Sequence, residues 1–246
     1  MTKFHIASGV FLIGLTIALD SLASQTTPVV PVAVTTQDLL KPKPAAAQAS
    51  TPPVPLKQLS GRRILVDAGH GGTDPGAMRA GVEEKDVTLD VSLLLRDKLK
   101  DLGASVDMTR DSDVFIPLPD RLAHSNNTCP DLFVSVHVNA IKKAGISGIE
   151  TYYFDDRSKP LAGVVLKTLS VRLHENAKWS HSRDLFVLDG NRVPATLAEI
   201  GYITNPATRA KLRTTAYQDK VASALADSVV TYLATPGAEH GCVLTS

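Results

Sequence analysis

The feature that most constrains the fold is a regular alternation of strand and helix patterns that begins near residue 61. The most apolar segment, 132–138, is a β-branched run of the kind that is buried on both faces of a sheet. Strands that alternate with helices indicate an α/β fold with a single mixed, mostly parallel sheet flanked by helices on both faces. The expected strands are 63–66, 104–109, 132–138, 149–154, 185–188 and 195–203.

Amphipathic helices are expected between these strands. From Glu84 to Leu102, apolar residues recur at i, i+4 and i+7 spacing, which predicts one long helix with a single buried face. Gly103 is placed to end it, because glycine is favoured just beyond a helix C-terminus. The remaining helices are expected near 119–127, 161–173 and 217–233.

The first 24 residues have the pattern of a secretory signal peptide. Lys3 precedes an apolar stretch from Ile6 to Leu19, and a run of small residues follows it. An uncleaved membrane anchor is the alternative. The stretch is, however, shorter than the ~20 apolar residues that a membrane-spanning helix needs. We therefore expect an exported protein.

Residues 25–60 are rich in Pro, Ala and Thr. Such a composition offers little to bury and keeps the backbone extended, so we expect a disordered linker. A loop inside a larger fold is the alternative, although such long loops are uncommon in compact domains. A folded domain is then expected over 61–236, followed by a flexible tail at 237–246.

Charge and cysteine content narrow the expected partners. With 26 basic and 25 acidic side chains, there is no basic excess for nucleic acid or an anionic membrane. We expect no nucleic acid, no nucleotide and no transmembrane partner, and a monomer. Cys129 and Cys242 lack the spacing of metal ligands. They can pair after export, but the sequence does not place their Cα atoms within bonding distance, and we expect two unpaired thiols.

Two of the seven histidines stand at the ends of expected strands. His70 follows the strand 63–66 in a glycine-rich turn, and His137 lies near the end of 132–138. In open α/β sheets ligands bind at the carboxyl ends of strands, so the two imidazoles can meet there. Glu84 opens the long helix after a loop that can return it to His70. Two imidazoles and one carboxylate suit Zn²⁺ and leave a fourth position for water.

Each candidate also has a purely structural interpretation. A single histidine on a strand is more often a core or rim residue, and a glutamate in the first turn of a helix usually complements the helix dipole. Glu199 is one carboxylate within an apolar strand, where glutamate is rare without a partner. Near a cation it can act as a general base, and otherwise it is a salt-bridged core residue. The residues alone predict a metal site but name no reaction.

Four ordered segments resemble the motifs of one family. They are 66–77 (VDAGHGGTDPGA), 84–89 (EKDVTL), 133–140 (FVSVHVNA) and 194–205 (PATLAEIGYITN). Together they resemble the zinc-dependent N-acetylmuramoyl-L-alanine amidases of the amidase-3 type, and the resemblance spans roughly residues 62–235. It implies a mixed sheet flanked by helices, in agreement with the pattern above, and one Zn²⁺ per chain.

The resemblance implies a role for each matched position. His70, Glu84 and His137 fall on the zinc ligands of the family, and Glu84 is chosen over Glu83 because the ligand precedes lysine in the motif. Glu199 falls on the catalytic glutamate. Members of the family cleave the amide between N-acetylmuramic acid and the L-alanine of the stem peptide. The resemblance therefore implies a peptidoglycan hydrolase, located in the periplasm or at the cell wall.

Asn139 and Arg183 are further candidates for substrate binding. Asn139 follows the strand of His137, where a simple turn residue is the alternative. Arg183 matches a commonly basic position in the family and can meet a substrate carboxylate bidentately. Some family members carry a helical insertion between the third and fourth motifs that covers the zinc. The segment 139–194 leaves little room for one, so we expect an accessible site.

Two other functions remain open at this point. Another zinc peptidase of the cell wall, such as a carboxypeptidase that acts on stem peptides, would use the same metal chemistry. A catalytically inactive wall-binding regulator is the alternative from a different class. Such a regulator would be expected to lack a ligand or the base, whereas all four positions are occupied here.

Overall fold

The computed structural model describes residues 57–242. The predicted signal peptide at 1–24 and the predicted linker up to residue 56 lie outside the described residues. No helix within 57–242 combines the length and apolar character needed to cross a membrane. The described part already contributes to the core at Leu59, which is 1% exposed and whose N–H donates to the carbonyl of Leu102.

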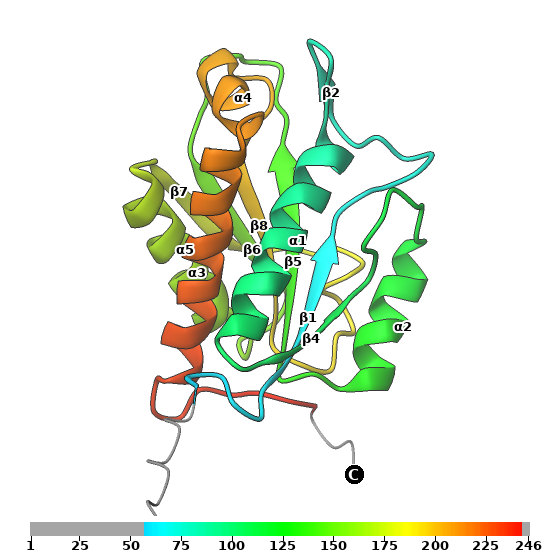
Figure 1. The fold of residues 1–246 in the computed structure, drawn as a ribbon, viewed down its shortest axis with the longest axis vertical. Helices are drawn as coiled ribbons and strands as arrows, with labels where there is room; N and C mark the ends of the chain where they lie inside the picture. Colours follow the sequence, from blue (N-terminus) through cyan, green and yellow to red (C-terminus); the bar gives the residue numbers. More distant parts are fainter. Residues whose placement is uncertain (1–56, 243–246) are drawn as a thin grey trace, which may run out of the picture. The chain divides into compact units, whose positions relative to one another are not determined.

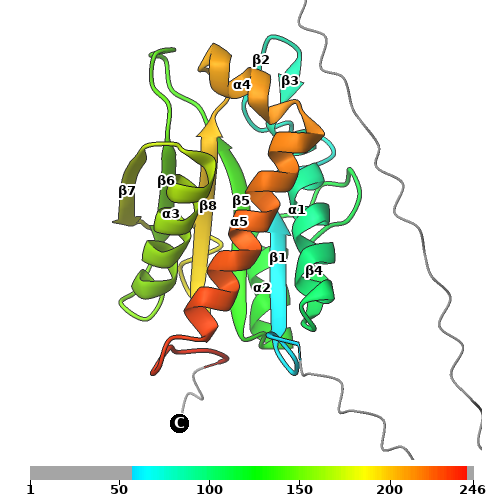
Figure 2. The ribbon, with the colours of Figure 1, turned by 60° about the vertical axis from the view of Figure 1, so that its left-hand side comes forward.

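Six strands form one sheet in the order β4-β1-β5-β8-β6-β7 (Figures 1 and 2). Neighbouring strands are parallel, except that β6 runs antiparallel to β8. The predicted mixed, mostly parallel sheet is therefore confirmed. The strands are β1 (Arg63–Ala68), β4 (Ser105–Met108), β5 (Leu132–Asn139), β6 (Ile149–Tyr153), β7 (Ala177–Ser182) and β8 (Ala195–Tyr202).

Helices cover both faces of this sheet (Figure 2). On one face α1 and α3 contact the strands, and α5 lies over the same face and contacts these two helices. On the other face lies α2. Two hydrophobic cores, a larger and a smaller one, lie on the two faces of the sheet. Successive side chains of β1 point to opposite faces, so Ile64 and Val66 pack in the larger core and Leu65 packs in the smaller one. The helices are α1 (Glu84–Asp101), α2 (Leu118–Thr128), α3 (Lys159–Leu173), α4 (Pro206–Leu212) and α5 (Thr215–Leu233).

Helix α1 ends just before Gly103, as the sequence predicts. Gly103 has φ +97°, a backbone conformation that glycine adopts at little cost. Its N–H donates to the carbonyl of Lys100, and the N–H of Ala104 donates to the carbonyl of Leu99. These two bonds satisfy carbonyls that the helix end would otherwise leave unpaired. The chain therefore turns directly from α1 into β4.

The prediction of a strand at 185–188 is wrong. This segment is a turn, in which the N–H of Leu188 donates to the carbonyl of Leu185. Its apolar side chains are buried because the turn packs over the smaller core, with Val187 4% and Leu188 2% exposed. The edge position of the sheet belongs to β7, whose sequence AKWSHS is too polar to give a strand signal.

Two other elements were not predicted. The short helix α4 begins with a proline after Asn205, whose side chain accepts a hydrogen bond from the N–H of Thr208. The strands β2 (Met78–Arg79) and β3 (Val82–Glu83) form a separate antiparallel hairpin. Both elements are shorter than the windows over which periodicity can be recognised.

Cys129 and Cys242 form a disulfide, so the expectation of two unpaired thiols is wrong. Cys129 ends α2, and Cys242 lies beyond α5. The N–H of Gly241 donates to the carbonyl of Asp131, which holds the C-terminal segment beside the start of β5. The two cysteines are 113 positions apart in the sequence, and their proximity depends on the whole fold rather than on any local pattern.

We expect the double variant Cys129→Ser/Cys242→Ser to lose about 2–5 kcal/mol of unfolding free energy. A cross-link over 113 positions restricts the unfolded chain more than the folded one. Urea unfolding of the oxidised protein and of the double variant measures the difference. A reducing agent should destabilise the wild type and leave the variant unchanged. Equal stability of the two oxidised proteins would show that the bond contributes nothing.

Candidate metal centre

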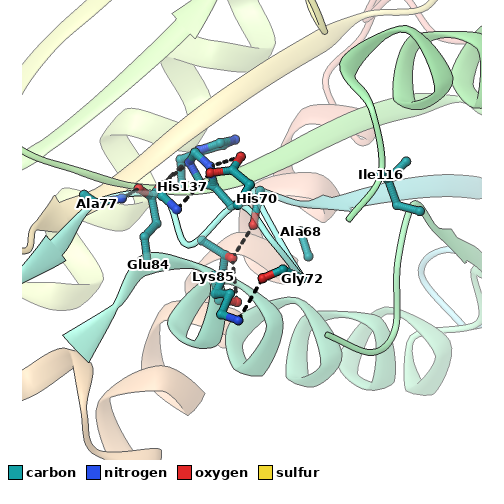
Figure 3. A network of polar contacts seen from close by, with 12 residues as sticks. Ala68, His70, Gly72, Ala77, Glu84, Lys85, Ile116 and His137 are labelled. Carbon is teal, nitrogen blue, oxygen red and sulfur yellow. Dashed lines mark hydrogen bonds and ion pairs between the residues drawn. The ribbon is translucent and has the colours of Figure 1, made fainter. Parts of the chain in front are cut away.

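Three side chains from three elements meet at the carboxyl end of the central strands (Figure 3). His70 follows β1, His137 lies in β5, and Glu84 is the first residue of α1. Glu84 Oε1 lies 3.2 Å from His70 Nε2 and 3.0 Å from His137 Nδ1. One ligand atom from each side chain lies within 4.8 Å of the others. The structure thus brings together the three side chains that the sequence analysis selected.

Glu84 is held as a carboxylate by its surroundings. Its Oε1 accepts a hydrogen bond from the N–H of Val138, and its Oε2 accepts one from the N–H of Ala77, both at 2.9 Å. Burial acts to raise the pKa of Glu84, but its hydrogen bonds with His137 and His70 outweigh this and hold the pKa well below the usual value. The group therefore carries a negative charge beside two imidazoles.

Asp74 fixes the orientation of the His70 ring. Its Oδ2 lies 2.8 Å from His70 Nδ1. Because a carboxylate can only accept, Nδ1 carries the proton and Nε2 is turned toward Glu84. Burial acts to lower the pKa of His70, but Glu84 and Asp74 together raise it above the ordinary value. A carboxylate behind a histidine is the usual outer support of a metal ligand.

The chain around the site approaches the ligands so closely that glycine is required. A Cβ atom at Gly76 would lie 2.6 Å from the His70 ring and 2.7 Å from Glu84 Oε2, and the residue has φ +64°. A Cβ atom at Gly69 would lie 2.4 Å from the His137 ring. The glycine-rich turn around His70 therefore includes Gly69, a position where any side chain would collide with the ring of His137.

Glu199 lies on β8, directly beside the strand of His137. The register pairs it with His137 on one side and with Glu150 of β6 on the other, so the three side chains share one face. Burial raises the pKa of Glu199 well above its usual value, and the negative charges of Glu84 and Glu150 raise it further. Its Oε2 is buried and has no hydrogen-bond partner within the described part of the chain. Such an atom indicates a site for a ligand.

Glu150 is a residue of the site that the sequence analysis missed. It is 6% exposed and accepts hydrogen bonds from the hydroxyls of Tyr152 and Tyr202 and from the side chain of Asn139. Asn139, a candidate for substrate binding, is therefore engaged with this carboxylate. The signal that selected Glu199, one carboxylate within an apolar strand, is present at Glu150 as well and could have found it.

Arg183 lies on the β6–β7 side of the site. Its guanidinium carbon is 5.4 Å from the centre of the Tyr152 ring. The side chain is exposed, and its positive charge acts to lower the pKa of Glu199. This cation is therefore close enough to influence the site and open to an approaching anion.

Two buried arginines lie behind the His70 turn. Arg121 Nη1 is 2.7 Å from Asp67 Oδ1, and its Nη2 donates to the carbonyl of His70 at 2.6 Å. Arg110 donates to the carbonyls of Ala68 and Gly69. Burial acts to raise the pKa of Asp67, but Arg121 and two hydroxyl donors hold it below the usual value. His70 adopts φ +60°, which is uncommon for a residue other than glycine, and these bonds hold the turn in place.

We expect Arg121→Ala to lower the free energy of unfolding by about 3–5 kcal/mol, because Asp67 would remain buried without its partner. Arg172→Ala is the matched control. Arg172 is 61% exposed in its ion pair with Asp227, and exposed pairs of this kind contribute less than about 1 kcal/mol. Urea unfolding compares the two variants with the wild type. Similar losses for both would contradict the role given to Arg121.

A groove of about 390 Å³ opens beside the candidate ligands. His70 and His137 line it, together with Asp67, Asp74 and Arg121. Its apolar lining comes from Phe115, Ile116, Leu118, Leu185, Phe186, Val187 and Leu197. Between residues 140 and 194 of the described chain the one helix is α3, and it packs on the sheet face opposite to this groove.

Comparisons with known proteins agree with one another. A family model described as N-acetylmuramoyl-L-alanine amidase (Amidase_3) matches residues 64–231. The germination-specific N-acetylmuramoyl-L-alanine amidase of Bacillus subtilis (strain 168) is 32% identical over 196 residues, which cover 73% of this chain and 83% of that protein. Uncharacterized protein YqiI of the same strain is 37% identical over 190 residues, which cover 76% and 89%.

A solved structure extends these likenesses to three dimensions. The N-acetylmuramoyl-L-alanine amidase from Clostridium difficile 630 aligns with a TM-score of 0.69 at 33% sequence identity. The alignment covers 72% of this chain and 98% of that chain. The residues matched by the family model, 64–231, include His70, Glu84, His137 and Glu199.

Proposed function

The chain belongs to the N-acetylmuramoyl-L-alanine amidases of the amidase-3 type, and we infer from this how its residues hydrolyse the amide of peptidoglycan. The bond lies between N-acetylmuramic acid and the L-alanine of the stem peptide. One observation supports the residue assignment. Three ligand-type atoms lie within 4.8 Å of one another, and the neighbouring strand carries Glu199, whose buried Oε2 has no hydrogen-bond partner among residues 57–242.

We propose that His70, Glu84 and His137 hold one Zn²⁺. Two imidazole nitrogens and one carboxylate oxygen form the donor set of a catalytic zinc site, which keeps a fourth position open. The buried Oε2 of Glu199 fits this assignment, because the described part of the chain gives it no partner, and a cation with its water would provide one. When bound, zinc lowers the pKa of a water molecule toward ~7 and polarises the scissile carbonyl.

The side chains of this protein then have distinct tasks. Glu199 takes a proton from the attacking water and passes it to the leaving nitrogen of L-alanine. Asp74 holds the His70 ring so that Nε2 faces the site. Glu150 keeps a second carboxylate beside Glu199, held by two tyrosine hydroxyls. Its negative charge helps Glu199 to retain the proton that the leaving nitrogen needs.

We propose that the protein is exported and acts in the periplasm or at the cell wall. The signal-peptide pattern at residues 1–24 supports export. The disulfide between Cys129 and Cys242 supports it independently, because such bonds persist in oxidising compartments and are rare in the cytosol.

Digestion of isolated peptidoglycan by the purified protein tests this proposal. We expect wall material to be solubilised without any added partner protein, because no helix of the described chain covers the groove. A zinc chelator should stop the reaction, and added Zn²⁺ should restore it. Digestion that continues in the metal-free protein would refute the metal assignment, and activity only after addition of a partner would refute the open site.

A further inference from the structure

We propose that the apolar groove beside the metal centre binds the saccharide of the substrate, whereas the stem peptide extends toward Arg183. The inference rests on the proposed amide hydrolysis and assigns the direction in which the substrate lies across the site. We define the saccharide groove by Phe115, Ile116 and Leu118 on one wall and by Leu185, Phe186 and Val187 on the other.

The groove is continuous with the proposed zinc ligands. His70 and His137 belong to its lining, so a group that is bound in the groove lies next to the bond that is cut. One wall is the loop that leads into α2, and the other is the turn that follows β7. Phe115 is 49% exposed and Phe186 50%. The two rings thus offer apolar surface that the protein itself does not cover.

Charge distinguishes the two halves of the substrate. The saccharide is neutral and presents C–H faces and N-acetyl methyl groups, whereas the stem peptide carries carboxylates. Among the residues that line the groove besides the histidines, the one cation is Arg121, which is 2% exposed and already paired with Asp67. Asp74 adds a carboxylate at the rim. This lining offers an anionic peptide no free cationic side chain and suits aromatic contact with neutral sugar rings.

Arg183, an exposed cation near the site, is not among the residues that line the groove. The guanidinium of Arg183 lies over the ring of Tyr152 on β6. In the sheet, β6 is two strands away from β5, which carries His137. An exposed guanidinium can bind a carboxylate with two parallel hydrogen bonds. With the scissile amide at the metal, the saccharide fits the apolar side and the charged stem fits the side of Arg183.

The test uses soluble substrates that share one stem peptide. The stem is attached either to N-acetylmuramic acid alone or to a disaccharide of N-acetylglucosamine and N-acetylmuramic acid. We expect the wild type to prefer the disaccharide substrate. Phe115→Ala and Phe186→Ala should each lower kcat/KM for that substrate about tenfold, mainly through KM, and reduce the preference. Val171→Ala, an exposed truncation on α3, should change neither value.

Substitution of Arg183 should affect recognition of the stem peptide and not recognition of the saccharide. Arg183→Ala should raise KM for a stem with a free α-carboxylate but not for the same stem with that group amidated. The preference for the disaccharide should remain as in the wild type. If the phenylalanine variants instead respond to amidation of the stem, or lower kcat/KM equally for both sugar lengths, the groove does not bind the saccharide.

Binding of a disaccharide without a stem peptide can be measured independently of amide hydrolysis. The peptide-free disaccharide is titrated into the wild type and into Phe186→Ala, and backbone amide shifts are followed by NMR. Weaker binding by the variant supports the groove even if no amide were cleaved. Equal binding by both proteins, in an enzyme that does release stem peptides, would overturn the groove and leave the proposed function intact.

Discussion

Glu199→Gln should lower kcat by about 10²–10⁴-fold, the usual contribution of a general acid–base group, while zinc stays bound at the wild-type level. Glutamine keeps the shape of the side chain but cannot take a proton from water. Glu199 is not among the three side chains that converge as candidate metal ligands, so its replacement should not empty the site. Glu199→Ala should lose activity in the same way and also keep zinc.

The pH profile adds a second test of Glu199. Because burial and the charges of Glu84 and Glu150 raise the pKa of Glu199, the rate should fall on the acid side at a higher pH than an ordinary glutamate would give. Glu150→Gln removes one of these charges, which makes ionisation of Glu199 easier and should move the acid limb to lower pH. Near wild-type rates in Glu199→Gln would show that another group is the base.

His137→Ala should lose zinc and activity together. Substitution of outer-shell partners alone commonly lowers metal affinity 10–100-fold, so loss of a ligand should lower it by more than about 100-fold. Apart from His70, no histidine within residues 57–242 belongs to the converging group, so none is in position to replace His137. Elemental analysis of the purified variants measures the zinc content.

Adjacent glutamates give a matched control for the ligand set. Glu84→Gln should lose zinc, whereas Glu83→Gln should keep both zinc and activity, because Glu83 is the residue before α1 and is not part of the converging group. Full zinc occupancy in His137→Ala or in Glu84→Gln would remove that residue from the ligand set. Loss of zinc in Glu83→Gln would mean that the motif was aligned one residue out of register.

The sequence predicts those parts of the fold that depend on local patterns. Apolar strands locate His70 and His137 at neighbouring strand ends, and the helical period places Glu84 at the start of α1. The β7 strand is not predictable in this way, because it is a polar edge strand held by pairing with β6. The apolar turn at 185–188 resembles a strand for the complementary reason: its burial comes from packing over the sheet.

The supporting residues of the site are harder to predict from the sequence than the candidate ligands. Arg121 lies in a helix pattern where a charged side chain is normally exposed, yet it is 2% exposed because it reaches Asp67 and the carbonyl of His70. These partners are more than 50 positions away in the sequence. The disulfide and the contacts of Glu150 likewise join segments that only the completed fold brings together.

The most direct test of the central claim is the mass of the products released from purified peptidoglycan. The zinc-loaded wild type should release intact stem peptides with a free L-alanine amino terminus and leave glycan without peptide, and Glu199→Gln should release neither. Products shortened only at the D-alanine end, with the bond to N-acetylmuramic acid intact, would contradict the account.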